Sequence, residues 1–470
     1  MRNAHSTAPR IDLDHWAKRL ARLAERHGTP GAQLGILRYV PGGEDEMAVA
    51  TYGVLNLQTQ QPVSSDAIFQ VGSITKVWTA TMILQLVDEG LVDLDVPVVT
   101  VLPELRLADP EVTKQVTLRH LLNHTSGIDG DVFTDTGRGD DCLERYVELL
   151  AEQTQNHPLG ATWSYCNAGF TVLGRVIEKV TKQTWDDALR ERIITPLGLQ
   201  HTVTLPEEAL LHAAAVGHLA HEGKKTLAPV WQLPRSLGPA GLVTASAADV
   251  LAFARLHLTG GLGPGGEQIL SAESAAAMVD HQADLPDKLS LGDSWGLGWI
   301  RFDWSGHRLY GHDGKTIGQA AFLRVLPEAG LAVVLLTNDD GSRDLYEDLY
   351  REIFAELVDV EMPRPPTPPQ PPVADPAAEI APYVGRYARA GISMEVFVGD
   401  RGPMLRTTLS GPIAEMIPDP VEEHPLVPYR PAMYLTKPPE AETWMPVTFY
   451  ELATGERYLH HGVRATPRVI

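Results

Sequence analysis

A proline-dense segment divides the chain into a long part and a short part. Residues 363–376 read PRPPTPPQPPVADP, with eight prolines in fourteen positions. Proline fixes the backbone angle φ and lacks an N–H, so this density produces an extended, semi-rigid spacer that no compact element can cross. We therefore predict a body over residues 1–360, a linker over residues 361–377 and a separate domain over residues 378–470.

Hydrophobic patterns predict the fold of the two parts. In the short part, alternating stretches such as MEVFV are broken by glycine and proline, which indicates a small β-rich domain. In the long part, strand patterns lie at both ends and helical periodicity lies between them, which favours an α+β body whose two ends share one sheet around a helical insertion. The predicted strands are 31–40, 46–53 and 331–337, and the predicted helices are 73–89 (closed by Gly90), 167–181 and one that opens at Ser246, which pairs with Asp249 as in a capping box.

The charge balance argues against two classes of partner. The sequence has 39 Lys and Arg against 60 Asp and Glu, a formal net charge of −21. Such a surface repels nucleic-acid phosphates and anionic lipid headgroups. The sequence also has no apolar run near the roughly 20 residues that span a bilayer. We therefore expect neither nucleic acid nor membrane as a partner.

The first residues and the cysteine count predict the compartment. The sequence begins with an amphipathic helix pattern rather than the apolar core of a secretory signal. The two cysteines, Cys142 and Cys166, are too few for a disulfide framework. We expect a cytoplasmic enzyme.

A serine and a lysine stand three residues apart in the segment FQVGSITK, residues 69–76. At the start of a helix, the Ser73 hydroxyl lies beside free backbone N–H groups, and Lys76 projects from the same face one turn later. Lys76 can accept the Ser73 proton only if burial or a nearby cation lowers its pKa. Taken alone, the pair is more typical of a capping serine followed by an exposed lysine.

Two further segments carry polar groups suited to one cleft. In the loop GATWSYCN, Tyr165 and Asn167 are two residues apart and can face the same side. The phenol of Tyr165 can act as a base or proton relay, and the amide of Asn167 can bind a substrate carbonyl. In YGHDGKTIG, closely spaced glycines permit the approach of a ligand backbone, and His312 can donate a hydrogen bond at the far wall. A backbone N–H just past Gly314 can join that of Ser73 in an oxyanion hole. Each segment alone also fits a loop over a core or a hairpin with a surface histidine.

Together and in this order, the three motifs resemble the serine β-lactamase and penicillin-binding-protein-like superfamily, in the branch of class C β-lactamases, D-amino peptidases and related esterases. Further stretches of the sequence carry the same resemblance, which covers roughly residues 15–355: VTLRHLLNHTSG at 116–127, GPAGLVT at 238–244 and WGLGW at 295–299. The resemblance implies a β-lactamase-like antiparallel sheet flanked by helices, with a helical subdomain. The short part resembles, more weakly, the accessory β domains often attached to this family.

The resemblance also implies roles for the motif residues. Ser73 is the acylated nucleophile, and Lys76 and Tyr165 are its base and proton relay. Asn167, His312 and Gly314 line the substrate site, and the N–H groups of Ser73 and Lys315 form the oxyanion hole.

Two departures from the family pattern matter for activity. Class C β-lactamases have the lysine of K-T-G where this chain has His312, which shifts the expectation away from efficient antibiotic hydrolysis. Cys166 replaces the usual serine between the tyrosine and the asparagine, a change that we expect the fold to tolerate.

Other candidate sites in the sequence are weaker. Ser294 lies in a G-x-S-x-G pattern, but a nucleophile elbow needs a helix after the serine and the residues that follow read as a strand. The histidine pairs at 218/221 and 460/461 lack a third ligand at a convincing spacing, so we predict no metal and no cofactor.

The sequence therefore predicts acyl-enzyme catalysis on a small ester or amide. If water resolves the acyl-enzyme, the protein is an esterase or amidase. If an amine or alcohol resolves it, the protein is an intracellular transacylase of small-molecule biosynthesis. A non-catalytic binding module is a third alternative. The oligomeric state and the role of residues 378–470 stay open: they can cover the cleft, mediate dimerisation or stabilise the body.

Overall fold

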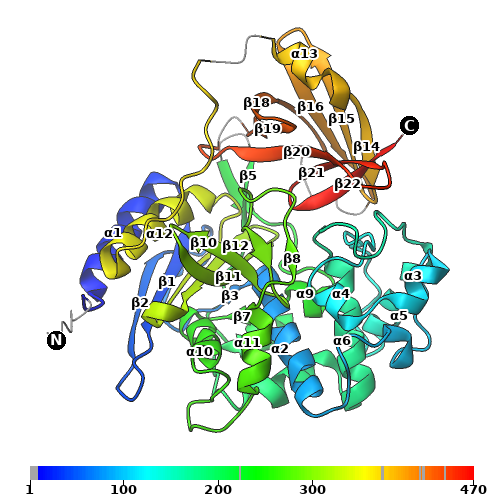
Figure 1. Cartoon of the computed structure of the whole chain (residues 1–470). Helices are drawn as coiled ribbons and strands as arrows, with labels where there is room; N and C mark the ends of the chain where they lie inside the picture. Colours follow the sequence, from blue (N-terminus) through cyan, green and yellow to red (C-terminus); the bar gives the residue numbers. More distant parts are fainter. Residues whose placement is uncertain are drawn as a thin grey trace, which may run out of the picture.

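The computed structural model describes residues 9–221, 224–371, 375–411, 414, 419–438 and 441–469. Figure 1 shows two parts: a large body with a central sheet and many helices, and above it a smaller β domain near the C-terminus. The chain thus has the predicted α+β body followed by a β-rich domain.

The central sheet is built from both ends of the body, as predicted. Its strand order is β2-β1-β13-β12-β11-β10-β9-β8, and every neighbouring pair is antiparallel. The strands are β1 Gly31–Arg38, β2 Glu46–Gly53, β8 Ala283–Asp284, β9 Ser294–Trp295, β10 Ile300–Trp304, β11 His307–Thr316, β12 Gln319–Leu326 and β13 Leu331–Thr337. The three predicted strands correspond to β1, β2 and β13. Every residue of β13 is buried, which explains why its sequence LAVVLLT is apolar up to the final Thr337.

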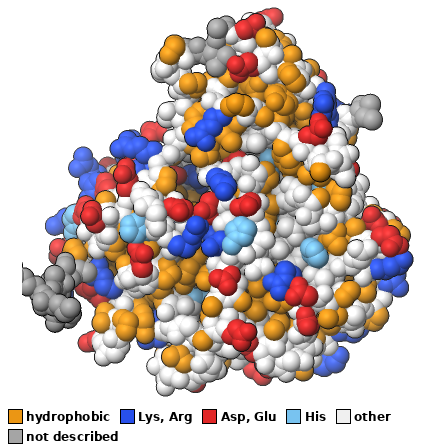
Figure 2. Space-filling model, viewed as in Figure 1, with side chains coloured by type: hydrophobic (Ala, Val, Ile, Leu, Met, Phe, Trp, Pro, Cys, Tyr) orange, Lys and Arg blue, Asp and Glu red, His pale blue; other side chains and the backbone are white. Residues whose placement is uncertain are grey.

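Helices cover both faces of this sheet. On one face, α1 (Leu13–Arg26) packs beside α12 (Arg343–Val358). Charged side chains gather over these two helices at the left of Figure 2, where they form ion pairs such as Arg26–Asp348 at 3.1 Å. On the other face, α10 (Ala247–Leu258) lies against β1, where a Cβ on Gly35 would come within 2.7 Å of Leu251.

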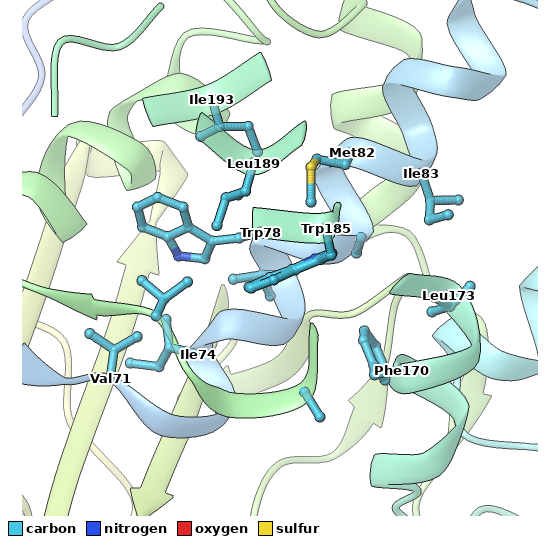
Figure 3. Close-up of a cluster of buried hydrophobic side chains, with 14 of the residues drawn as sticks. Val71, Ile74, Trp78, Met82, Ile83, Phe170, Leu173, Trp185, Leu189 and Ile193 are labelled. Atoms are coloured by element: carbon cyan, nitrogen blue, oxygen red, sulfur yellow. The ribbon is translucent and has the colours of Figure 1, made fainter. Parts of the chain in front are cut away.

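The helical part of the body surrounds α2 (Thr75–Asp88), of which only the last two residues, Val87 and Asp88, are not fully buried. Figure 3 shows Trp78, Met82 and Ile83 of α2 among side chains from α6 (Asn167–Thr181) and α7 (Trp185–Leu189). The other helices here are α3 Pro110–Gln115, α4 Leu118–Leu122, α5 Cys142–Leu149, α8 Pro206–Ala209, α9 Gly238–Gly241 and α11 Ala272–Val279. A helix buried on all sides holds its first turn rigidly, and the serine-lysine pair lies in that turn.

The predicted helix boundaries hold with two adjustments. The helix predicted from residue 73 begins with a 3₁₀ turn over Gly72–Ile74, so Ser73 precedes α2 proper, and Gly90 follows its end with φ +70°. Ser246 caps α10 by accepting the Asp249 N–H at 3.2 Å. The Asp249 carboxylate, however, accepts from the His201 N–H and the Thr202 hydroxyl, both at 2.8 Å, so only one half of the predicted capping box forms.

The C-terminal β domain, defined here as residues 385–469, follows the proline-dense segment. Residues 361–371 contain no helix or strand, and the short helix α13 begins at Pro376 and ends at Ile380. In the described residues the domain is one antiparallel sheet of nine strands, ordered β17-β16-β15-β14-β22-β21-β20-β19-β18. The strands are β14 Gly385–Arg389, β15 Ile392–Gly399, β16 Gly402–Leu409, β17 Val421–Pro425, β18 Val427–Arg430, β19 Met433–Thr436, β20 Met445–Glu451, β21 Arg457–His461 and β22 Arg464–Val469.

Among the helices that the structure describes, none is long and apolar enough to cross a membrane.

Candidate active site

The Ser73 backbone is pressed against strand β11 of the central sheet. Gly72 has φ +53°, and a Cβ there would lie 2.6 Å from the Lys315 nitrogen. A Cβ on Gly314 would lie 1.9 Å from the Val71 oxygen and 3.1 Å from the Ser73 nitrogen. Only glycine permits this approach at both positions. The backbone nitrogens of Ser73 and Lys315, which are the predicted oxyanion hole, therefore adjoin the place where Gly72 and Gly314 approach each other.

Lys76 is completely buried and its Nζ has three polar neighbours. Nζ lies 3.2 Å from the Ser73 Oγ and donates to the Asn167 Oδ1 and to the Ala240 carbonyl, both at 2.7 Å. Burial lowers the pKa of Lys76 well below its ordinary value, and the Arg464 cation lowers it further. A neutral amine has two N–H bonds and one lone pair. With both N–H bonds directed at Asn167 and Ala240, the lone pair is left for Ser73.

Tyr165 lies beside this amine. The Lys76 Nζ is 4.8 Å from the centre of the Tyr165 ring. Burial raises the pKa of the Tyr165 hydroxyl above its ordinary value, and interactions with Ser73 and Arg464 offset only part of that rise. The hydroxyl therefore stays protonated at neutral pH. It can donate or relay a proton, but it is not a standing phenolate base.

The loop that holds Tyr165 is fixed by His124, a residue that the sequence reasoning did not assign. The His124 Nδ1 accepts the Cys166 N–H at 3.0 Å, and its carbonyl accepts the Ser164 N–H at 3.0 Å. Burial lowers the pKa of His124, so the ring is neutral and can accept. His124 lies in the quoted stretch 116–127, and Ala240 lies in the stretch 238–244. Their place in these two stretches is the sequence signal that could have assigned both residues to the site.

His312 lies at the far wall of the cleft, and it is not a surface residue. The side chain is buried, with its ring centre 6.2 Å from that of Tyr165. Burial lowers the pKa of His312 to about 3, so the ring is neutral. Its Nδ1 lies 2.6 Å from the Asp313 carbonyl, which only accepts, so Nδ1 carries the proton. Nε2 is therefore an acceptor, which differs from the donor expected from the sequence.

The C-terminal β domain reaches this site through the turn between β21 and β22. The Val463 carbonyl accepts the Tyr165 N–H at 3.0 Å, and the Ala465 N–H donates to the Ser164 Oγ at 3.1 Å. Figure 1 shows β21 and β22 as the strands of this domain that lie nearest the body. No sequence signal identified the turn, because its contacts join residues about 300 positions apart.

Two arginines of the C-terminal β domain share one carboxylate of the body. Arg464 lies above the Tyr165 ring, 5.1 Å from its centre, and its Nη2 donates to the Asp131 Oδ1 at 2.8 Å. Arg389 pairs with the other oxygen of Asp131. The Asn167 Nδ2 also donates to the Asp131 Oδ1, at 3.3 Å. None of these three charged residues was predicted as part of the site.

A cavity of about 580 Å³, lined mainly by apolar side chains, adjoins the segments that carry Ala240 and Lys315. Ile317, two residues after Lys315, and Leu242, two residues after Ala240, both line it. Its two arginines are paired: Arg138 with Glu207, and Arg235 with Asp186 at 3.0 Å. Asp135 also lines the cavity and accepts the Gly137 N–H at 2.8 Å. The large apolar residues of the lining are Phe133, Leu205, Trp231, Leu233, Leu242 and Ile317.

The weaker candidate sites behave as structural residues. Ser294 lies on β9, its hydroxyl donates to the Asp293 Oδ1 at 2.8 Å, and strand β10 follows. His218 bonds the Asn338 carbonyl, and His460 pairs with Asp287. Among the described residues, no group of three or more His, Cys, Asp or Glu is placed to hold a metal ion.

Comparison with known proteins identifies the family. The family model "Beta-lactamase" matches residues 16–357. The chain belongs to the beta-lactamase family. Its relatives by sequence include a β-lactamase of Providencia stuartii and the esterase EstB of Burkholderia gladioli, which places it among the serine hydrolases of that family in general.

The similar proteins differ in how much of this chain they cover. Penicillin-binding protein 4 of Amycolatopsis lactamdurans is 46% identical over 388 residues, which cover 81% of this chain and 99% of that protein. The crystal structure of SurE matches with a TM-score of 0.76 and 27% identity, covering 97% of this chain and 98% of SurE, and SurE was also solved with D-Leu. The D-amino acid amidase of Ochrobactrum anthropi SV3 matches at a TM-score of 0.57 and 25% identity, over 69% of this chain and 90% of the amidase.

Proposed function

We propose that the protein forms an acyl-enzyme on Ser73 from an ester or amide and releases the acyl group to water, as an amidase or esterase. The observation that carries the proposal is the position of the Lys76 Nζ, which donates to two carbonyl-type oxygens and lies 3.2 Å from the Ser73 Oγ. Burial and the Arg464 cation lower the pKa of Lys76, which favours the neutral amine that can take the serine proton.

The reaction follows from this arrangement. As the Ser73 Oγ attacks the substrate carbonyl, its proton passes to the Lys76 Nζ. The negative charge on the carbonyl oxygen is stabilised by the N–H groups of Ser73 and Lys315; loss of one such donor typically costs about 2.7–4 kcal/mol of transition-state stabilisation. The proton then passes through the Tyr165 hydroxyl to the leaving amine or alkoxide. Water then attacks the ester carbonyl of the acyl-enzyme. The proton transfers run in reverse: Tyr165 and Lys76 take the proton of water, and the Ser73 Oγ is protonated as it leaves.

We further propose a D-configured, apolar residue on the acyl side of the substrate. SurE was solved with D-Leu, and a further structural neighbour is an amidase of D-amino acids. The cavity near Ala240 and Lys315 is in the size range of small-ligand pockets and lined mainly by apolar side chains, and both of its arginines are already paired. An anionic side chain would find both arginines already paired, whereas an aromatic or branched aliphatic one would displace water from apolar surface.

A second candidate function is transfer of the acyl group to an amine or alcohol. The observation in its favour is the cover over the site: the turn between β21 and β22 packs on the Tyr165 loop. A covered site that excludes water prolongs the life of an acyl-enzyme and gives a bound acceptor the advantage.

Intact-mass spectrometry tests both functions. The purified protein and Ser73→Ala are incubated with p-nitrophenyl butyrate and with the p-nitroanilides of D- and L-phenylalanine. We expect an acyl adduct on the wild-type protein only, and faster nitroaniline release from the D-isomer. Rapid loss of the adduct in water supports the hydrolase, and its persistence until an amine is added supports the transacylase. Adducts on Ser73→Ala, or none on the wild type with any donor, would overturn the proposal and leave the binding module as the leading alternative.

A further inference from the structure

Four side chains form a continuous chain of hydrogen bonds from the C-terminal β domain to the catalytic lysine. Arg464 donates to Asp131 at 2.8 Å, Asn167 donates to the same oxygen of Asp131 at 3.3 Å, and Lys76 donates to Asn167 at 2.7 Å. The first of these residues lies on β22 and the last on α2. The proline-dense segment separates the two elements in sequence, so the folded molecule alone brings them together.

The chemistry of Asp131 decides how Asn167 is oriented. An ionised carboxylate only accepts hydrogen bonds, so it requires the amide nitrogen of Asn167 to face it. The amide oxygen then faces Lys76, which only donates at its N–H bonds. If the amide turned over, its NH₂ group would face the N–H bonds of Lys76 and the lone pair would no longer be directed at Ser73. Asp131 therefore determines which amide orientation is stable.

The C-terminal β domain keeps Asp131 ionised. The side chain of Asp131 is only 13% exposed, and burying an unpaired carboxylate is costly. Arg389 and Arg464 each pair with one of its oxygens, so the two cations surround the single anion. Burial alone would raise the pKa of Asp131, but the two arginines outweigh burial and hold it below its ordinary value.

We propose that Asp131, clamped by Arg389 and Arg464, is a positioning residue that orients Asn167 and balances the charge around Lys76. This inference rests on the proposed acyl-enzyme function. The charged or titratable groups that face Lys76 are Arg464 from β22, Asp131 from the loop after α4, Cys166 and Tyr165 from the loop before α6, His124 after α4 and His312 on β11. His124 and His312 are neutral, and the thiol and the phenol stay protonated, so Asp131 and Arg464 are the two charges that a substitution can remove.

The test measures the rate of Ser73 acylation by p-nitrophenyl butyrate against pH. Arg464→Met removes a cation and raises the pKa of Lys76, so the midpoint of the profile moves up by about 1 pH unit. Asp131→Asn removes an anion, so the midpoint moves down by a similar amount. The amide of Asn167 also loses its fixed orientation in Asp131→Asn, and the maximal rate falls on the order of 10- to 100-fold. Arg464→Lys restores the wild-type midpoint.

The matched control is Asp287→Asn, because Asp287 is a second buried carboxylate held by the C-terminal β domain, through His460 at 2.8 Å. It has no contact with Asn167, so we expect its acylation midpoint to stay at the wild-type pH. Circular dichroism establishes that each variant is folded. Equal midpoints in the wild type, Arg464→Met and Asp131→Asn, with acylation of Ser73 intact, would overturn this inference alone. Absence of acylation in the wild-type protein would instead overturn the proposed function.

Discussion

The two regions that meet at the site contribute in different ways. The body supplies the atoms that react: Ser73, Lys76 and Tyr165 all lie within its helical part. The C-terminal β domain supplies atoms that hold these groups in place, through Val463 and Arg464. Reactive groups come from short motifs at helix starts and strand edges, whereas supporting groups come from any surface that the fold brings near. A substitution in the first region should therefore stop the reaction, and one in the second should tune it or weaken domain docking.

Replacement of Lys76 should have the largest effect. Lys76→Met removes the base while it keeps an unbranched side chain of similar length in the buried position, so the fold should persist. We expect Ser73 acylation to fall by about 10²- to 10⁴-fold. Stopped-flow release of p-nitrophenol measures the rate, with Arg464→Met as the comparison from the other region. A loss in Arg464→Met as large as that in Lys76→Met would break the distinction between reacting and supporting residues.

A glycine substitution in each region sharpens the same comparison. In Gly314→Ala, the new Cβ would lie 1.9 Å from the Val71 oxygen, so β11 and the Ser73 turn must separate and the oxyanion hole opens. We expect a loss of about 10²- to 10³-fold in kcat. In Gly455→Ala, on the C-terminal β domain, nothing lies within 4 Å, but φ is +97°. That variant should lose about 1 kcal/mol of stability from backbone strain and keep its activity.

The buried pair His460–Asp287 should govern how firmly the two regions dock. Burial alone would raise the pKa of Asp287, but the hydrogen bond and charge of His460, together with Ser290, lower it to about 2. Because this value lies below the unfolded-state value of about 3.9, the stabilisation is complete above about pH 4 and is lost between roughly pH 4 and pH 2. His460→Ala leaves the carboxylate without its partner and should cost about 3 kcal/mol of unfolding free energy at neutral pH.

Urea unfolding of the wild type, His460→Ala and Asp287→Asn at pH 7 and pH 3 measures this contribution. The difference between the wild type and the variants should shrink at the lower pH. A difference that is the same at both pH values would show that the pair does not link the regions through charge.

The smallest effect should come from Cys166. Its thiol accepts the Gly169 N–H at 3.2 Å and so caps α6, a function that a serine hydroxyl also performs. Cys166→Ser should therefore change the acylation rate by less than about threefold. Burial raises the pKa of the Cys166 thiol to about 12, and that of Cys142 to about 11, so neither forms a thiolate at pH 8. Iodoacetamide should leave the native protein unlabelled by mass spectrometry, and rapid labelling of Cys166 would show that the site opens.

Local sequence patterns predicted the elements of the body well, because those elements depend on local periodicity and on caps. The helix that begins at Asn167 ends at Thr181 as predicted, and the apolar run 331–337 is a buried central strand. The Asp249 half of a capping box was wrong for a tertiary reason: the carboxylate bonds His201 and Thr202 instead. A local pattern cannot reveal which distant donors compete for a side chain.

The same limit applies to the site. The sequence alone determined which side chains have the chemistry for acyl transfer, since the serine-lysine spacing and the glycines of β11 are local properties. It also required that Lys76 be buried or lie near a cation, without identifying that cation. Only the tertiary structure decided that the cation is Arg464, nearly 400 residues away, and that Asp131 balances it. The energy of a charge-charge contact depends on distance in space. The local sequences around Lys76 and Arg464 do not specify that distance; only folding of the chain sets it.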